Sequence, residues 1–389
     1  MNHYPLTKIV DDMRAWRQQI HSFPETAFSE FETSKLIAKV LRKATIEVHE
    51  NIATTGVVGV LKAGNSNKSI ALRADLDALH IQELNTFDYC SKVPGKMHAC
   101  GHDGHSAMLL GAAKYLAESQ DFDGTVYFIF QPAEEQGSGC LSMLAEGLFD
   151  RFPADEIYGM HNMPSYDAGT FAIKPGVMLA AFATFECEIE GKGTHASMPE
   201  TGINPIEVAV EVHQAWLKHY QSNIDTNEIK FSITKFESGA ALNVIPNTAL
   251  LGGSVRYYSN EEIDNFRQTM LHLVKVICDK YQSKFEFNFN TICTPLVNSD
   301  KQAMFAADVA THIVGEAKVE RSIDRLLASE DFAYFLEKKP GAYILIGNSG
   351  EDHGGCMIHN PHYDFNDDIL ETGASFWIKL VEQYLSKNL

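Results

Sequence analysis

The sequence predicts an α/β protein in which a smaller βαββαβ domain interrupts a larger α/β/α domain. Three observations carry this prediction: short apolar strands alternate with amphipathic helices early in the chain, the strand pattern changes near residue 180, and the first pattern resumes after Thr294. Alternating strands and helices favour helical layers over a largely parallel sheet. We therefore expect a discontinuous large domain at 1–179 plus 294–389 and an inserted domain at 180–293.

The elements of the large domain follow from the spacing of its apolar residues. Ile9, Met13, Trp16 and Ile20 recur at helical spacing, which predicts a first amphipathic helix. Further helices are expected at 32–41, 104–116, 301–314 and from about 368 to 384. Strands are expected at 57–61, 69–73, 125–130, 156–160 and 342–346. Ser329, which two acidic residues follow, is expected to cap one more helix.

The inserted domain begins with an alternating strand. Phe185, Cys187 and Ile189 alternate with glutamates, as in a strand with one buried and one exposed face. Asn204 and Pro205 suit the N-cap and the first position of a helix. Strands are then expected at 229–236, 249–257 and 284–292, with a helix at 261–281. This βαββαβ order is the ferredoxin-like arrangement.

The composition excludes several classes of protein. Lys and Arg number 32 and Asp and Glu 51, which gives a formal charge of −19. A chain this acidic is poorly suited to nucleic-acid backbones or anionic lipid. No apolar run approaches the ~18 residues of a membrane helix, and the N-terminus lacks a signal-peptide pattern. The seven scattered cysteines do not form a disulfide framework, so we expect a cytoplasmic protein.

Four polar segments are dense in side chains that bind metals. The first, residues 97–105, holds three His, one Cys and one Asp. Adjacent Glu134 and Glu135 follow the strand at 125–130, His161 follows the strand at 156–160, and His359 lies near the C-terminus. Taken singly, each segment also fits a polar loop, an acidic helix start or a turn. Because ligands bind beyond the carboxyl ends of strands in such sheets, we expect the segments to meet there.

Together these segments supply at least five good ligands and one spare carboxylate. A single open catalytic zinc ion takes three protein ligands and a water, so five ligands suit two metal ions, about 3.5–4 Å apart. Of two adjacent carboxylates, one can bind metal while the other acts as a general base. Asp75, at another strand end, either orients a ligand histidine or caps a helix.

An ordered set of motifs runs along essentially the whole chain. Its members lie at residues 21–25, 73–79, 100–102, 131–135, 159–162, 193–199, 243–246, 329–332 and 359–361. The set resembles the hippurate hydrolase and N-acyl-amino-acid amidohydrolase family, which includes plant auxin-conjugate hydrolases and N-acetyl-diaminopimelate deacetylases. This family is related to the aminoacylases and di-zinc carboxypeptidases. The resemblance implies a zinc-peptidase-like catalytic domain and an inserted lid and dimerisation domain.

The resemblance also implies a set of metal ligands, which are Cys100, His102, Glu135, His161 and His359. They would hold two divalent ions, with zinc the first choice and manganese, cobalt or nickel the alternatives. The Cys100 thiolate is expected to bridge the ions. We also expect a homodimer, or a dimer of dimers, that forms through the inserted domain.

Catalytic and substrate-binding roles are assigned to five further residues. By resemblance, Glu134 is the general base, Asp75 is the orienting carboxylate and His195 stabilises the oxyanion, either in its own subunit or in the partner's. Asn243 is expected to reach the substrate. Arg256 is a candidate clamp for a free carboxylate, and the alternative is an ion pair on the sheet surface.

The implied activity is hydrolysis of the amide bond of an N-acyl amino acid by a metal-activated water. A dipeptidase or carboxypeptidase is the main alternative. Two further alternatives are a hydrolase with Cys100 as nucleophile and a non-catalytic protein that binds metal or peptide. The sequence leaves the acyl group open, since acetyl, benzoyl, indole-acetyl and aminoacyl substrates all suit these motifs.

Overall fold

The computed structural model describes residues 6–350 and 356–387, which fall into two compact units. The catalytic unit, as we name it, takes in the described parts of Met1–Met178, Val297–Asp324 and Glu330–Leu389. The inserted unit takes in Leu179–Leu296 and Arg325–Ser329. The short return segment Arg325–Ser329 therefore belongs with the inserted unit, although the sequence pattern had left it in the large domain.

The catalytic unit is built on an eight-stranded mixed sheet with the order β1-β2-β4-β3-β5-β16-β6-β15. Its strands are β1 (Glu47–Ile52), β2 (Gly56–Ala63), β3 (Ser69–Asp75), β4 (Gly124–Gln131), β5 (Glu156–Asp167), β6 (Phe171–Ala172), β15 (Val319–Glu320) and β16 (Gly341–Ser349). The four central strands, β4, β3, β5 and β16, are mutually parallel. The predicted α/β fold is thus confirmed, but the sheet is parallel mainly at its centre, because β1, β2 and β4 pair antiparallel.

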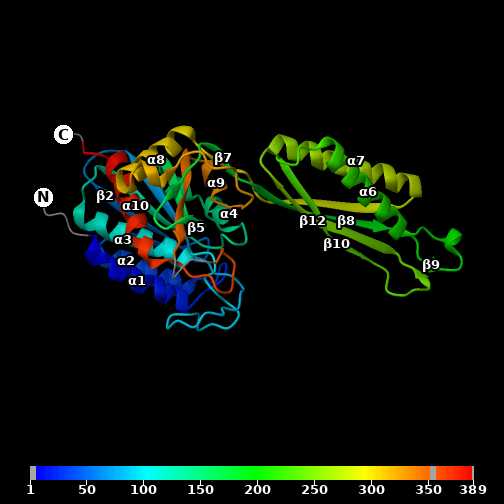
Figure 1. Ribbon diagram of the computed structural model, residues 1–389, viewed down its shortest axis with the longest axis horizontal. Coiled ribbons are helices and arrows are strands. Elements are labelled where there is room, and N and C mark those ends of the chain that lie inside the picture. The colour runs from blue at the N-terminus through cyan, green and yellow to red at the C-terminus, as the bar shows by residue number, and fades with distance from the viewer. Residues whose placement is uncertain (1–5, 351–355, 388–389) are drawn as a thin grey trace. The chain divides into compact units, whose positions relative to one another are not determined.

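Helices cover this sheet, and two of the most distant in sequence lie together. The α-helices are α1 (Thr7–Ser22), α2 (Phe31–Lys43), α3 (His102–Ser119), α4 (Gly139–Ala145), α5 (Leu148–Arg151), α8 (Asp300–Val314), α9 (Ala333–Leu336) and α10 (Leu370–Tyr384). Both α1, blue in Figure 1, and α10, red, pack against α3. No helix in residues 6–350 and 356–387 combines the length and hydropathy of a membrane span.

Two local features of the fold differ from the sequence prediction. Strand β1 was not predicted, because Glu47, His49 and Glu50 make it largely polar and partly exposed, without an apolar period. The prediction that Ser329 caps a helix is wrong. The Ser329 hydroxyl donates a hydrogen bond to the Ala180 carbonyl at 2.8 Å, and α9 begins only at Ala333. The Ser329 hydroxyl thus bonds a backbone carbonyl that is distant in sequence, and it does not cap a helix N-terminus.

The inserted unit has its own sheet and its own core. Strands β8 (Ala181–Glu190), β10 (Ile229–Ser238), β12 (Thr248–Tyr257) and β13 (Lys284–Cys293) form an antiparallel sheet with the order β10-β12-β8-β13. Figure 1 shows α6 (Pro205–Asn223) and α7 (Asn260–Tyr281) along one face of this sheet. The predicted cap of α6 is confirmed, since the Asn204 side chain accepts a hydrogen bond from the Ile206 amide.

Four short strands form two small two-stranded sheets. Within the inserted unit, β9 (Thr194–His195) and β11 (Val244–Ile245) pair antiparallel beside the 3-10 turn at Pro199–Thr201. Strands β7 (Gly176–Leu179) and β14 (Leu296–Asn298) form a separate two-stranded sheet. The remaining 3-10 turns are at Glu316–Lys318 and Asp367–Ile369.

A buried histidine ties α1 to the rest of the catalytic unit. His21 is fully buried, with Nδ1 at 2.8 Å from Asp103 Oδ2 and Nε2 at 3.2 Å from Glu83 Oε1. Burial lowers the pKa of His21, but the two carboxylates outweigh burial and Arg17, and they raise this pKa from 6.5 to about 9. His21 is therefore positively charged in the folded protein near neutral pH.

We predict that the stabilisation from the His21 charge is lost as pH rises. A pKa raised on folding gives stability that is complete below the unfolded value of 6.5 and disappears as pH passes about 9. The difference in unfolding free energy between the native protein and His21→Gln should thus fall by about 3 kcal/mol from about pH 6 to about pH 10. Urea unfolding of chelator-treated protein would measure it. A difference that stays constant over this range would contradict the assigned charge.

Candidate metal centre

The segments with metal-type side chains meet beyond the carboxyl ends of the central parallel strands. Asp75 is the last residue of β3, Glu134 and Glu135 follow β4, and His161 lies in β5. Helix α3 begins at His102. Because β4, β3 and β5 are adjacent and parallel, their ends bring together residues separated by up to 86 positions in the chain.

All five predicted metal ligands come together in the structure. Cys100, His102 and His161 each offer one donor atom within 4.8 Å of the others, and Cys100, Glu135 and His359 do the same. Cys100 Sγ lies 3.3 Å from His161 Nε2, and Glu135 Oε1 lies 3.4 Å from His359 Nε2. Cys100 is common to both groups, as a bridging ligand would be. The assignment of these residues as ligands remains a prediction.

The backbone around Cys100 requires a glycine. Gly101 has φ of +97°, in the left-handed region, and an added Cβ would lie 2.1 Å from Asn162 Oδ1. This turn places Cys100 and the first residue of α3, His102, beside the same centre. His359 reaches it from the C-terminal part of the chain, and its amide donates a hydrogen bond to the Ala99 carbonyl at 2.7 Å.

Hydrogen bonds fix the orientation of two predicted ligand rings. His102 Nδ1 lies 3.3 Å from Asp77 Oδ1, and His161 Nδ1 lies 2.6 Å from the Asn162 carbonyl oxygen. When Nδ1 carries the proton in each ring, Nε2 keeps its lone pair for a cation. His102 Nε2 and Glu135 Oε1 are buried without a hydrogen-bond partner among the described residues. These two unsatisfied atoms, one of imidazole and one of carboxylate type, lie beside the Cys100 sulfur, and the three donor types together fit divalent cations.

Asp77 is a site residue that the sequence prediction missed. Besides facing His102, its carboxylate accepts the backbone N–H groups of Glu134 at 3.1 Å and Glu135 at 3.0 Å. Asp75, the predicted orienting carboxylate, instead bonds His105 Nδ1 at 2.6 Å, and its Oδ2 lies 3.8 Å from His102 Nε2. A role for Asp75 at a ligand histidine stays a prediction. The two-residue spacing between Asp75 and Asp77 could have indicated this role for Asp77, because residues 75 and 77 point to the same side of an extended chain.

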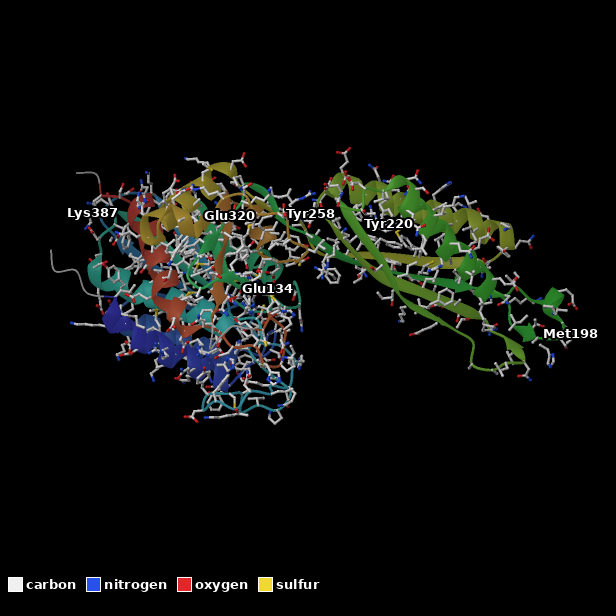
Figure 2. The ribbon with its side chains drawn as sticks, viewed as in Figure 1. Glu134, Met198, Tyr220, Tyr258, Glu320 and Lys387 are labelled. Atoms are coloured by element: carbon white, nitrogen blue, oxygen red, sulfur yellow. The ribbon has the colours of Figure 1, made fainter. Side chains whose placement is uncertain are left out.

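The environment of Glu134 favours a bound proton. Figure 2 labels this residue in the catalytic unit, where its side chain is buried. Burial, and then the neighbouring carboxylates with Glu330 first, raise the pKa of Glu134 well above its usual range. Glu330 and Asp331 each place a carboxylate oxygen within 4.8 Å of it. A carboxylate with high proton affinity suits the expected task of a general base.

Arg73 organises the acids beside Glu134. Its guanidinium is completely buried and donates hydrogen bonds to Asp75 at 2.7 Å, Glu330 at 3.0 Å and Asp331 at 3.3 Å. Nε also donates to Gln131 Oε1 at 2.8 Å. One arginine thus fixes three carboxylates from two distant parts of the chain, which a planar set of donors does well. The sequence motif at 73–79 gave no indication of this role for Arg73.

The three other predicted site residues belong to the inserted unit. His195 is exposed on β9, and the Ser197 amide donates a hydrogen bond to its Nδ1 at 3.2 Å. Asn243 accepts a backbone hydrogen bond from Ala196, so it lies next to the His195 strand. Arg256 on β12 donates to the Ser329 hydroxyl and stacks over a phenylalanine ring. The roles of these three residues at the substrate stay predictions.

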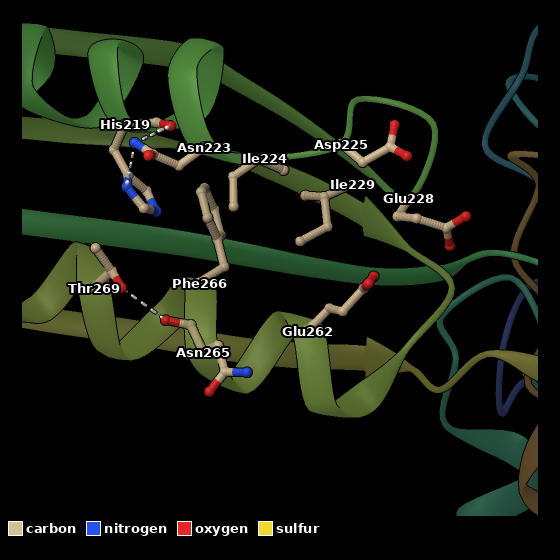
Figure 3. Close-up of a pocket in the computed structure, with 10 residues that line it drawn as sticks. All are labelled: His219, Asn223, Ile224, Asp225, Glu228, Ile229, Glu262, Asn265, Phe266 and Thr269. Carbon is tan, nitrogen blue, oxygen red and sulfur yellow. Dashed lines mark hydrogen bonds between the residues drawn. The ribbon is translucent and has the colours of Figure 1, made fainter.

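The inserted unit also has a hollow of about 230 Å³ between α6 and α7, drawn in Figure 3. Its walls include a stacked pair, His219 and Phe266, whose ring centroids are 6.0 Å apart. Glu228 on its rim forms an ion pair with Arg325 at 2.6 Å. Within the described part of the chain, none of its lining residues belongs to a group that could hold a cation.

Known proteins resemble the chain along nearly its full length. A model of peptidase family M20/M25/M40 matches residues 71–383. The hippurate hydrolase of Campylobacter jejuni is 41% identical over 370 residues, which cover 95% of each chain. Thermostable carboxypeptidase 2 of Saccharolobus solfataricus is 35% identical and covers 92% of this chain and 91% of its own. Among solved structures, a dinuclear metal binding peptidase of the M20 family from Bacillus subtilis has a TM-score of 0.85 at 30% identity, covering 98% of this chain and 100% of its own. The resemblance that the motifs indicated is confirmed.

We predict that Cys100→Ser lowers the amount of bound metal by at least one ion per chain. Cys100 takes part in both donor groups, and a serine hydroxyl does not replace a thiolate as a ligand. Metal analysis after reconstitution and desalting would measure the loss. Cys140→Ser is the matched control, because Cys140 is also buried in the same unit but belongs to neither group. Unchanged metal content in Cys100→Ser would remove this residue from the centre.

Proposed function

The chain belongs to peptidase family M20/M25/M40, and from this premise we propose that it is a metal-dependent amidohydrolase acting on N-acyl amino acids. The products would be a carboxylic acid and a free amino acid. The observation that carries this proposal is the convergence of five donor residues around a spare carboxylate, Glu134. The 41% identity to a hippurate hydrolase supports an N-acyl amino acid as the substrate class.

The metal ligands in this proposal are Cys100, His102, Glu135, His161 and His359, which would hold two divalent cations, and Cys100 belongs to both groups of donors. The mixture of thiolate, imidazole and carboxylate supports zinc, and manganese, cobalt and nickel are the alternatives. When bound, such cations lower the pKa of a water molecule and polarise an amide carbonyl.

Glu134 performs the proton transfers in this mechanism. Its carboxylate accepts a proton from the attacking water and then donates that proton to the departing amine nitrogen. Asp77 holds the backbone N–H groups of Glu134 and Glu135, which keeps the two side chains directed to different tasks. Asp75 is held between Arg73 and His105 and supports the histidine side of the site.

His195 is proposed to stabilise the oxyanion. Because its Nδ1 accepts the Ser197 amide, the neutral ring carries its proton on Nε2, which leaves an N–H free to donate to a developing negative charge. Arg256 and Asn243 are proposed to bind the substrate, Arg256 at the free carboxylate. Burial lowers the pKa of Arg256, but a guanidinium stays charged at physiological pH.

We further propose a homodimer, with a dimer of dimers as the alternative, that forms through the inserted unit. Strands β10 and β13 are the edges of its sheet and can pair with another copy. Met198, Leu242 and Val244 are exposed near the β9 and β11 strands, where a partner would cover them. His195 would then act either in its own subunit or in the partner's.

The cytoplasm is the proposed location of this enzyme. No disulfide joins any two of the seven cysteines in the described part of the chain, which supports a reducing compartment. The charge of −19 supports small-molecule substrates and opposes binding to nucleic acid or anionic membranes.

Two alternatives differ from this proposal in chemistry. A dipeptidase or carboxypeptidase would hydrolyse a peptide bond at the same metal centre. The similarity to a carboxypeptidase supports this alternative. A hydrolase with Cys100 as nucleophile is disfavoured, because burial and then Glu135 raise the pKa of the Cys100 thiol well above its usual range. Only the thiolate is strongly nucleophilic.

We expect Glu134→Gln to lower turnover of N-acyl amino acids by at least ~10²-fold and to leave bound metal unchanged. The amide keeps the size of the side chain but cannot accept the proton. Hydrolysis of N-benzoyl, N-acetyl, indole-acetyl and dipeptide substrates, each with zinc, manganese, cobalt or nickel, is the measurement. Glu135→Gln is the matched control and should lose metal as well as activity. Near-native turnover by Glu134→Gln would refute its role as the base, and preference for dipeptides would favour the peptidase alternative.

If the subunits share active sites, mixing two inactive variants should restore activity. His195→Ala and Glu134→Gln homodimers each lack one function, but a mixed dimer would contain one site with both residues intact. Up to about a quarter of native activity is expected after equal mixing, since half of the dimers are then mixed and each has one of two sites complete. Subunit exchange is verified with differently tagged chains. Verified exchange without recovered activity would place His195 at the site of its own subunit.

A further inference from the structure

A buried charge network joins α1 to two segments that carry proposed metal ligands. Arg17 on α1 is completely buried. Its Nε donates to Asp367 Oδ1 at 2.7 Å, and its Nη1 donates to Asp364 Oδ1 at 3.2 Å and lies 3.8 Å from Asp103 Oδ2. Arg17 lies outside residues 71–383, the region that the family model matches.

One side of the network reaches the start of α3. Asp103 directly follows His102 and is also completely buried. Its Oδ2 is shared between Arg17 and His21, one turn further along α1. Two positive side chains of α1 therefore hold the residue next to a proposed ligand.

The other side reaches the segment that carries His359. Asp364 accepts hydrogen bonds from Arg17 and from the Tyr89 hydroxyl at 2.8 Å, and the Arg17 guanidinium lies 4.5 Å from the centre of the Tyr89 ring. The backbone already joins this segment to the Cys100 segment through the amide of His359. Arg17 also connects the His102 and His359 segments, because its guanidinium lies near both Asp103 and Asp364.

Stability alone is a weak reason for these buried charges. Helix α1 already packs through apolar residues, among them Met13, which lies against Gly111 of α3. Buried ion pairs often stabilise no more than apolar residues of the same size, because each charge loses its hydration. Arg17 Nη2 and Asp103 Oδ1 also have no hydrogen-bond partner among the described residues. The charge network also fixes the positions of the segments that carry His102 and His359.

We propose that Arg17 and His21 are positioning residues of the metal centre: by holding Asp103 and Asp364, they fix the spacing of His102 and His359. This inference rests on the proposed function. The network atoms are not among the proposed ligand atoms, so its effect passes through the ligand-bearing backbone. Partners that orient metal ligands in this way change metal affinity without binding the metal themselves.

Cobalt(II) binding to the metal-free full-length chain tests this inference. The absorption bands of cobalt report the arrangement of its ligands, and a thiolate charge-transfer band reports Cys100. We expect Arg17→Met and Asp364→Asn each to weaken cobalt binding by ~10–100-fold and to alter the cobalt bands. Met13→Ala is the matched control, since it loosens the same contact between α1 and α3 without removing a charge. It should lower the melting temperature and leave the cobalt affinity and spectrum unchanged.

The inference is overturned if Arg17→Met and Asp364→Asn bind cobalt with native affinity and spectrum. If Arg17→Met does not fold, Asp364→Asn decides alone, because it leaves Arg17 paired with Asp367 and Asp103. An equal loss of cobalt affinity in Met13→Ala would also overturn it, since general loosening of α1 would then be the cause. Native protein that binds no cobalt, or binds it without a thiolate band, would instead refute the proposed metal centre itself.

Discussion

The centre is shaped by the burial of more acidic groups than nearby positive side chains can balance. Arg73 carries one charge and bonds Asp75, Glu330 and Asp331. Glu134 lies beside two of these carboxylates, and its pKa is raised as a result. Carboxylates this close, away from water, cannot all be ionised without additional positive charge. Divalent cations held by the neighbouring donors would provide that charge, so the acids and the proposed metal ligands would form one electrostatic unit.

The order of the strands makes this concentration of groups possible. Strand β3 lies between β4 and β5, and all three run in the same direction. Their carboxyl ends therefore deliver Asp75, Glu134 and His161 to one edge of the sheet. Asp77 then fixes the turn after β4 by accepting two successive backbone N–H groups. The fold thus supplies the proximity, and short-range hydrogen bonds supply the direction of each side chain.

The sequence predicted those features that depend on local pattern. Apolar periodicity predicted the central strands and the main helices, and ordered motifs predicted which residues meet at the centre. Strand β1 was missed because its side chains are polar, and Asp77 and Arg17 because their partners lie elsewhere in the chain. Ser329 shows the same limit, since a local cap and a distant carbonyl compete for its hydroxyl. Long-range partners depend on the fold and leave no periodic signal in the sequence.

Charge balance also links proton release to metal binding. Burial and then Glu135 raise the pKa of the Cys100 thiol, so that thiol keeps its proton when no cation compensates the nearby carboxylates. A cation that binds the thiolate must therefore displace a proton, and its affinity rises with pH. The same positive charge would lower the pKa of Glu134 from its high value toward the range in which a carboxylate can exchange protons near neutrality. The binding of a cation would thus favour both the deprotonated Cys100 ligand and a Glu134 carboxylate that can act as a base.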